Sequence, residues 1–246
     1  MRISRSRRCY STCTGPFEGS KVCKPAVADI SVLDLRAGVK HGGELDQVVR
    51  HVRIGGLVAH PTETVYGIGG LATAAGIAAL RRLKKRPEER PFLVLLPSVD
   101  AVPDLVWTED ACELASVFWP GALTLVLADP SGSFPPGVRS ATGGVAVRVT
   151  SHPVTRMLVE RLGVPLTSTS ANTPDAPSAT TGEEALSVVT SAGFGEEVWV
   201  LDAGRLSPSA PSTVVDCTGA FPVVLRAGAT PVHRLRCVLP GIHGDR

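Results

Sequence analysis

The chain has 246 residues, of which 43% are hydrophobic, and its formal net charge at pH 7 is +2. This length and hydrophobic content can form one complete buried core, so we expect a single domain. The nearly balanced charge excludes binding to nucleic acid by net charge alone, and an aromatic content of 4% is too low for a base-stacking platform. No apolar run approaches the roughly 20 residues of a membrane-spanning helix, so no membrane partner is expected.

The first 28 residues differ in composition from the rest of the chain. Four of the first eight residues are arginines, and Ser, Thr, Cys, Gly and Pro follow without apolar periodicity. We interpret 1–28 as a disordered basic extension, with a transit peptide as the alternative, followed by one domain over 29–238 and a tail over 239–246. The six cysteines show neither paired zinc-site spacing nor a disulfide framework, which favours a reducing, cytoplasmic location.

Helical and strand-like patterns alternate along most of the chain. Apolar periodicity and capping residues predict helices over 44–54, 73–86, 108–118, 151–162 and 182–190. Short apolar runs predict strands over 57–60, 92–96, 123–128, 145–149, 164–167, 198–201, 213–216 and 223–226. Strands that alternate with helices form parallel pairs, whereas the last strands crowd together. The chain is therefore predicted to form an α/β domain whose mixed sheet has an antiparallel portion near the C-terminus.

The segment 56–70 combines a buried strand with hydroxyl groups and bare backbone. The apolar strand 57–60 ends at Pro61, and Thr62 and Thr64 follow it, ahead of three closely spaced glycines. Ligands of open α/β sheets bind beyond the carboxyl ends of the strands. This segment therefore predicts an anion or nucleotide site at the edge of the sheet.

The same glycines fit a loose dinucleotide-binding pattern. Gly67, Gly69 and Ala72 match G-x-G-x-x-A, and Glu88 follows about 20 residues after the first glycine. However, Gly67 does not directly follow the strand, and Glu88 lies in a predicted loop instead of at the end of a second strand. A nicotinamide-dependent oxidoreductase is therefore a poorer interpretation than another kind of anion site.

Several cations occur where they could meet such an anion. Lys84 and Arg86 lie at the end of a predicted helix, where cations also simply complement the negative helix terminus. Arg148 lies in an apolar strand. On a half-exposed strand it would point to solvent, whereas on a covered strand its guanidinium must meet an anion. Arg226 ends a similar apolar run, so the same alternatives apply to it.

Hydroxyl and amide side chains cluster after two of the predicted strands. Ser168, Ser170, Asn172 and Ser178 follow strand 164–167 in a predicted loop, and Ser212 precedes another strand. Such residues are common in turns, and at this edge of the sheet they can also hold phosphate oxygens. No GxSxG motif is present, and no histidines have metal-site or triad spacing. The site is therefore predicted to bind and position anions without a covalent enzyme intermediate.

In their order along the chain, these segments resemble the YrdC family, the L-threonylcarbamoyladenylate synthases. The resemblance covers about 44–230 and is carried by 60–67, 84–87, 119–124, 145–148, 170–172, 212–216 and 225–226. It implies a single YrdC-like α/β domain with a twisted mixed sheet, flanking helices and a concave, positively charged cavity. The family type implied is the one without an extra C-terminal domain.

The resemblance also implies a reaction and a set of binding residues. L-threonine, bicarbonate and ATP would give threonylcarbamoyl-AMP and pyrophosphate, for transfer to a tRNA adenosine beside the anticodon. The residues implied to hold L-threonine are Thr62, Arg148, Ser168 and Ser212. The residues implied to hold ATP are Lys84, Arg86, Ser170, Asn172, Ser178 and Arg226. Of these, Lys84 and Arg86 would be catalytic, because they offset the charge that builds at the α-phosphate.

The remaining partners follow from the same resemblance. Mg²⁺ is expected with ATP, although no protein ligand for it is identified in the sequence. A downstream threonylcarbamoyl transferase complex and a contact with tRNA or double-stranded RNA are also expected. The chain departs from the usual family residues at Arg90, Phe92 and Gly144. The alternative function is a non-catalytic RNA-binding or ribosome-associated YrdC-like module, motivated by the basic cavity and the arginine-rich N-terminus.

Overall fold

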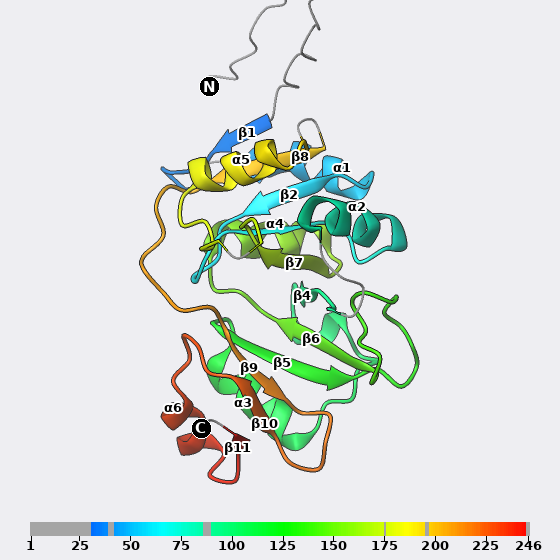
Figure 1. The fold of residues 1–246 in the computed structure, drawn as a ribbon. Helices are drawn as coiled ribbons and strands as arrows, with labels where there is room; N and C mark the ends of the chain where they lie inside the picture. The colour runs from blue at the N-terminus through cyan, green and yellow to red at the C-terminus, as the bar shows by residue number, and fades with distance from the viewer. Residues whose placement is uncertain (1–30, 39–41, 86–89, 175, 195–196, 245–246) are drawn as a thin grey trace, which may run out of the picture.

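A mixed sheet with helices on both faces makes up the computed structural model, which describes residues 31–38, 42–85, 90–174, 176–194 and 197–244 (Figure 1). Within these ranges the strands are β1 (Ser31–Asp34), β2 (Leu57–His60), β3 (Gly67–Gly69), β4 (Leu93–Leu95), β5 (Leu123–Ala128), β6 (Gly144–Arg148), β7 (Leu166–Ser170), β8 (Val198–Asp202), β9 (Thr213–Asp216), β10 (Val223–Arg226) and β11 (His243–Gly244). The helices are η1 (Gly42–Leu45), α1 (Asp46–Arg53), α2 (Ala74–Lys84), η2 (Val99–Ala101), α3 (Glu109–Phe118), α4 (Pro153–Leu162), α5 (Gly182–Ser191) and α6 (Val232–Val238).

The strand order is β1-β8-β2-β3-β7-β4-β6-β5-β9-β10-β11. Parallel pairs are β1 with β8, β8 with β2, β4 with β6, β5 with β9, and β10 with β11. Antiparallel pairs join β2 to β3, β3 to β7, β7 to β4, β6 to β5, and β9 to β10. The predicted mixed α/β fold is confirmed. The predicted antiparallel portion near the C-terminus is present in β9 and β10, and β3 and β7 also pair antiparallel in the middle of the sheet, where no such pairing was predicted.

Strand β2 shows why the apolar runs of this chain form buried strands. All four of its residues are buried, and they alternate between the two faces of the sheet. Leu57 and Ala59 belong to the apolar cluster that includes α2 and α5, whereas Val58 belongs to the cluster that includes α1 and α4. A continuous apolar run is expected for a strand that is covered on both faces. In the lower half of Figure 1, α3 packs on β5 and against α6.

Local signals set the helix ends as predicted. Thr73 and Thr108 precede α2 and α3, and their hydroxyl oxygens accept hydrogen bonds from Gly76 N and Ala111 N, each at 3.2 Å. Thr181 does the same for α5. Helix α2 ends at Lys84 because Lys85 adopts a left-handed conformation, with φ at 47°. The predicted stop at Pro87 lies outside the described residues.

Strand β7 extends further than its sequence predicts. The predicted strand ended at 167, with Ser168 and Ser170 in a loop, but both residues lie within β7. Ser170 pairs with Gly67 of β3 on one side, and Ser168 pairs with Leu93 of β4 on the other. The backbone of these hydroxyl-bearing residues is therefore held extended by two neighbouring strands. The local preference of Ser and Thr for turns does not predict this conformation.

The glycines after β2 form a strand instead of a nucleotide-binding turn. Gly67 and Gly69 are the ends of β3, and α2 begins only at Ala74. A Cβ atom at Gly69 would overlap the backbone oxygen of Thr167 in β7. Gly69 is thus required for the close approach of β3 to β7. The dinucleotide-binding interpretation of these glycines is wrong.

The C-terminal residues pack on the domain up to Gly244. Strand β11 pairs with β10, and Ile242 is only 5% exposed, so the residues assigned to a tail over 239–246 include a paired strand. The extension predicted over 1–28 lies outside the described residues. In the part of the chain that is described, none of the helices has the length and apolar character needed to cross a bilayer.

Substitution of Gly69 by alanine is expected to destabilise the protein strongly. The added methyl group cannot be accommodated against the Thr167 carbonyl without moving β3 away from β7, which should lower the free energy of unfolding by at least about 2 kcal/mol. Urea unfolding of the variant measures this loss. Gly241→Ala is the matched control, because no atom lies within 4 Å of its added Cβ, and its change should stay within about 0.5 kcal/mol. Equal stability of the two variants would contradict the close approach.

Candidate functional site

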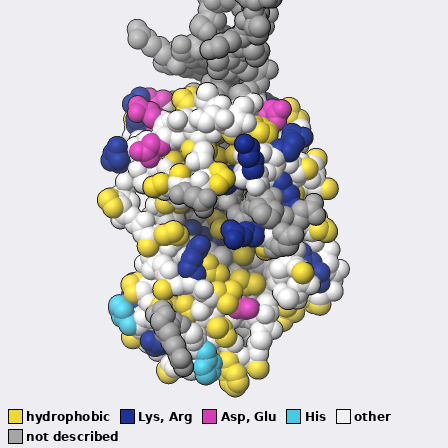
Figure 2. All heavy atoms as spheres, viewed as in Figure 1, with side chains coloured by type: hydrophobic (Ala, Val, Ile, Leu, Met, Phe, Trp, Pro, Cys, Tyr) yellow, Lys and Arg dark blue, Asp and Glu magenta, His cyan; other side chains and the backbone are white. Residues whose placement is uncertain are grey.

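A cavity of about 210 Å³ lies where the loop after β2 meets β6, β7 and the loop before β9. Its lining carries hydroxyl groups, two arginines and bare backbone, and no Asp or Glu side chain belongs to it among the described residues. Lys and Arg side chains also gather across the middle of the face shown in Figure 2. The lining residues are Thr62, Thr64, Val65, Gly67, Leu93, Arg148, Ser168, Thr169, Ser170, Ser178, Pro211, Ser212 and Arg226.

Most of the residues singled out in the sequence converge on this cavity. All four residues predicted to hold L-threonine line it, although they are as far apart as 62 and 212 in the chain. Three of the residues predicted to hold ATP line it as well, namely Ser170, Ser178 and Arg226. The carboxyl end of β6 supplies Arg148, and the end of β10 supplies Arg226.

A second, larger hollow of about 370 Å³ is elsewhere on the molecule. It is lined mainly by apolar residues near the start of α2, after η2 and before β7, and it contains none of the predicted site residues. Binding sites for charged ligands need converging polar groups. We therefore place the candidate site in the smaller cavity, which has them.

Lys84 and Asn172 lie behind Ser170 instead of lining the cavity. The Lys84 ammonium donates hydrogen bonds to Ser170 O at 2.9 Å, to Asn172 Oδ1 at 2.7 Å and to Asn172 O. Asn172 Oδ1 also accepts a hydrogen bond from Ser170 Oγ at 2.7 Å. The end of α2 and the end of β7 are thereby joined at the rim of the cavity. Arg86, the other predicted catalytic residue, is outside the described residues.

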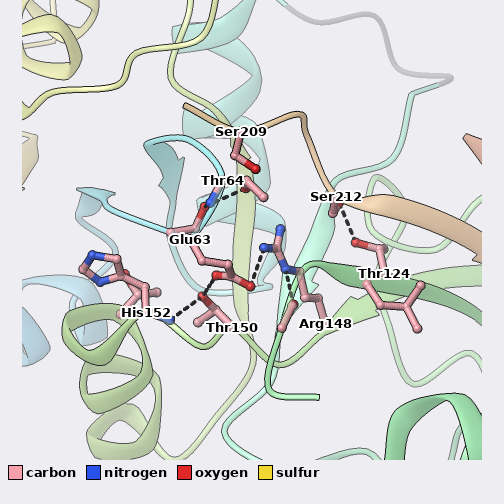
Figure 3. A network of polar contacts seen from close by, with 12 residues as sticks. Glu63, Thr64, Thr124, Arg148, Thr150, His152, Ser209 and Ser212 are labelled. Atoms are coloured by element: carbon pink, nitrogen blue, oxygen red, sulfur yellow. Dashed lines mark hydrogen bonds and ion pairs between the residues drawn. The ribbon is translucent and has the colours of Figure 1, made fainter. Parts of the chain in front are cut away.

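Arg148 is buried, and a carboxylate of the chain itself accompanies it (Figure 3). Its side chain is 4% exposed, its Nε donates to Gly121 O at 2.9 Å, and its Nη2 lies 2.7 Å from Glu63 Oε1. Thr150 Oγ1 donates to Glu63 Oε2 at 2.6 Å. The expectation that a guanidinium on a covered strand must meet an anion is confirmed, and the anion is Glu63.

Sequence reasoning missed Glu63 as a residue of this site. The available signal was an acidic residue between Thr62 and Thr64, directly after a fully buried strand. Burial alone would raise the pKa of Glu63. The charge of Arg148 and the hydrogen bond from Thr150 outweigh burial, so the pKa is lowered from its ordinary value. The carboxylate is therefore ionised at neutral pH.

Ser212 and Arg226 form a second polar group on the opposite wall. Arg226 Nε and Nη2 donate to Ser212 O at 3.1 and 2.8 Å, and Nη2 donates to Ser212 Oγ at 3.2 Å. Ser212 Oγ is also within 2.9 Å of Thr124 Oγ1, another residue that sequence reasoning did not assign to the site. Burial and the charge of Arg148 lower the pKa of Arg226. Two guanidinium groups that repel each other in this way would be stabilised by a bound anion.

His60 is packed in the core beside the cavity, directly before Pro61. It is fully buried, and its Nε2 lies 3.3 Å from Ser168 Oγ. Burial, together with the nearby His152 and Arg148, lowers the pKa of His60 to about 3, so its ring is neutral in the folded protein. A Cβ atom at Gly67 would come within 2.8 Å of both His60 Cε1 and Ser168 Oγ. The absence of a side chain at Gly67 therefore makes room for the contact between His60 and Ser168.

Comparisons with known proteins identify the family of this chain. The family model Sua5_yciO_yrdC, described as "Telomere recombination", matches residues 50–228. The chain belongs to the Sua5/YciO/YrdC family. It is 40% identical over 193 residues to the putative threonylcarbamoyl-AMP synthase of Mycobacterium tuberculosis. The matched region covers 76% of this chain and 85% of that protein. The YrdC resemblance seen in the sequence is thus confirmed.

Two further relatives are longer than this chain. The threonylcarbamoyl-AMP synthase of Bacillus subtilis is 32% identical over 208 residues, and this chain spans 58% of its length. The second is Sua5 from Pyrococcus abyssi, whose crystal structure is a complex with L-threonine. Its sequence is 31% identical to this chain, and its structure superimposes on this one with a TM-score of 0.79. The match covers 86% of this chain and 62% of that one. The fold of the Sua5/YciO/YrdC family is therefore shared over most of the described chain.

The departures from the usual family residues fall outside the cavity lining. Phe92 is 1% exposed and belongs to the apolar core, and Arg90 is exposed. Gly144 begins β6, four residues before Arg148, and a Cβ atom there would meet Val126 at 2.8 Å. Since the rise along a strand is about 3.3 Å per residue, Gly144 is roughly 13 Å from the end that carries Arg148.

The depressed pKa of His60 predicts a loss of stability in mild acid. The unfolded chain takes up a proton near the ordinary pKa of 6.5, whereas the folded chain does not until about pH 3. As the pH is lowered between these values, the free energy of unfolding should fall by about 1.4 kcal/mol for each pH unit because of this residue. In urea unfolding from pH 6 to pH 4, His60→Gln should therefore lose stability less steeply than the wild type by this amount.

The exposed His243 is the control for this measurement. His243→Gln should show the same slope of stability against pH as the wild type. The contributions of Glu63 and His152 are common to all three proteins and cancel in the comparison. Identical slopes for His60→Gln and the wild type would mean that His60 is protonated in the folded protein.

Proposed function

We propose that this chain is a threonylcarbamoyl-AMP synthase, which converts L-threonine, bicarbonate and ATP into threonylcarbamoyl-AMP, pyrophosphate and water. The observation that supports it most is the convergence of Thr62, Arg148, Ser168 and Ser212 on one cavity. Relatives that are 32% and 40% identical carry the name threonylcarbamoyl-AMP synthase, and a similar structure is a complex with L-threonine. Neither the RNA-binding alternative nor an oxidoreductase accounts for these findings together.

In this proposal the arginine-lined end of the cavity holds the amino acid. Arg148 binds the carboxylate of L-threonine, because a guanidinium offers planar paired donors for a carboxylate. The hydroxyls of Thr62, Ser168 and Ser212 surround the rest of the molecule. The amine stays unbound and attacks bicarbonate, which gives a carbamate and releases water. Such catalysis relies on orientation of the reactants, in agreement with the lack of a nucleophile motif.

The nucleotide lies toward Lys84 and the end of β7 in this proposal. Ser170, Asn172, Ser178 and Arg226 hold ATP, and Lys84 and Arg86 offset the charge as a carbamate oxygen attacks the α-phosphorus and pyrophosphate leaves. We also propose that the cavity carries a net positive charge, which would favour binding of the phosphates. No group of His, Cys, Asp or Glu that could hold a metal ion occurs in the described residues. In this proposal Mg²⁺ accompanies ATP on its phosphates.

The wider role of the protein is proposed on the same basis. The product would pass to a threonylcarbamoyl transferase complex that modifies the tRNA adenosine beside the anticodon. A cytoplasmic location and a contact with tRNA or double-stranded RNA remain predictions. The RNA-binding alternative predicts salt-dependent RNA affinity that survives Lys84→Ala nearly unchanged.

The proposed function predicts threonine-dependent release of pyrophosphate. Purified full-length protein is incubated with L-threonine, bicarbonate, ATP and magnesium. Pyrophosphate is measured together with threonylcarbamoyl-AMP. Omission of either threonine or bicarbonate should abolish both products. ATP turnover that is the same with and without threonine would contradict the proposal.

Replacement of Arg148 by alanine should reduce kcat/KM for L-threonine by at least about thirty-fold. The carboxylate then loses its charged partner, which is worth about 2 kcal/mol in the transition state. Arg156→Ala is the control. Arg156 is an exposed arginine of α4 that pairs with Glu160, and its loss should change kcat/KM less than two-fold. A similar small effect for both variants would remove Arg148 from the site.

Replacement of Lys84 by alanine should lower kcat more than it raises KM for L-threonine. The ammonium is assigned to the nucleotide and not to the amino acid, and removal of such a charge lowers the rate by roughly a hundred-fold or more. Lys85→Asn is the control, because Lys85 is the exposed neighbour and asparagine tolerates its left-handed backbone. An unchanged kcat for Lys84→Ala would exclude a catalytic role for Lys84.

A further inference from the structure

Glu63 lies behind the proposed threonine site without lining the cavity. We propose that Glu63 is a positioning residue: it holds the guanidinium of Arg148 in the orientation that receives the carboxylate of the amino acid substrate. The inference rests on the proposed function, since it assumes that the ligand of Arg148 is an amino acid. It assigns a role to a residue that contacts Arg148 and not the substrate.

Arg148 has two fixed partners, one through a hydrogen bond and one through an ion pair. Nε donates to Gly121 O at 2.9 Å, and Nη2 lies against Glu63 Oε1 at 2.7 Å. Nη1 donates to none of the residues that the structure describes. Because Gly121 and Glu63 occupy the Nε side of the planar group, the edge that includes Nη1 is the one left for a ligand. Arg148 itself lines the cavity, so this edge is available there.

Glu63 is fixed independently of Arg148. Its second oxygen accepts the hydroxyl of Thr150 at 2.6 Å, and Thr150 Oγ1 in turn accepts the backbone N–H of His152 at 3.2 Å. Thr150 is 1% exposed and is part of the segment between β6 and α4. Figure 3 shows this chain of contacts running from the start of α4 through Glu63 to Arg148. The carboxylate therefore cannot turn toward the cavity without breaking the Thr150 contact.

The charge of Glu63 matters as well as its position. Arg148 is 4% exposed, and its charge contributes to lowering the pKa of Arg226. Without Glu63, Arg148 would lose the carboxylate of the chain that pairs with it, and its guanidinium would relax toward another acceptor. An opposite view is that Glu63 competes with the substrate carboxylate for Arg148. The two views predict opposite changes in affinity when the charge is removed.

The test compares Glu63→Gln with the wild type by calorimetric titration of L-threonine and of L-threoninamide, which lacks the carboxylate. Glu63→Gln should weaken threonine binding about ten-fold and leave threoninamide binding within two-fold, because only the carboxylate uses Arg148. KM for ATP should stay within two-fold. Glu160→Gln, a change at an exposed glutamate of α4, should alter none of these values.

A double-mutant cycle separates positioning from a general structural effect. In the Arg148→Ala protein, Glu63→Gln should cause no further loss of threonine affinity, because Glu63 acts through Arg148. Thr150→Val keeps both charges and removes only the hydroxyl that orients Glu63, and it should weaken threonine binding about three-fold. This variant tests the inference even where Glu63→Gln does not fold. Unchanged threonine affinity in Thr150→Val would overturn it.

Other outcomes overturn the inference in distinct ways. Tighter threonine binding by Glu63→Gln would make Glu63 a competitor of the substrate. Equal weakening of threonine and threoninamide would make the effect merely structural. Because the titrations of threonine and threoninamide are binding measurements, they remain valid if the protein binds L-threonine but releases no pyrophosphate. In that case the proposed function fails while the role of Glu63 is still decided.

Discussion

The ion pair between Arg148 and Glu63 is the interaction around which the proposed site is organised. It joins the loop after β2 to the carboxyl end of β6, two strands that are separated by β3, β7 and β4 in the sheet. Removal of one partner of a buried pair costs about 3–5 kcal/mol, because the other charge stays buried without compensation. The pair therefore constrains how the two halves of the sheet meet, and the cavity lies at that junction.

Strand β7 supplies the second constraint on the site. It pairs with β3 and with β4, so its hydroxyls are held between the glycine-rich segment and the core strand that adjoins β6. Gly69 allows β3 to approach its backbone, and Gly67 leaves room for His60 beside Ser168. The glycines that looked like a phosphate-binding turn thus serve the packing of the sheet. The wall of the cavity is a consequence of that packing.

Much of the fold could be predicted because its signals are local. Apolar runs such as Leu57–His60 and caps such as Thr73 and Thr108 depend on residues near them in sequence, and the structure contains them as predicted. Strands β1, β3 and β11 and helix α6 were missed. For β3 the reason is that a three-residue strand with two glycines has no β propensity of its own. Such an element exists only because its neighbours supply hydrogen bonds on both sides.

For the site, the sequence by itself determined the family, through the ordered motifs around Thr62, Lys84, Arg148, Ser170 and Ser212, and it supplied the residues proposed to act. It also indicated that a guanidinium on a covered strand needs an anion. Only the tertiary structure decided that this anion is Glu63, that Lys84 contacts Ser170 and Asn172, and that Arg226 contacts Ser212. The physical reason is that these partners are between 14 and 88 positions apart. Their meeting depends on strand order and register, which no local pattern encodes.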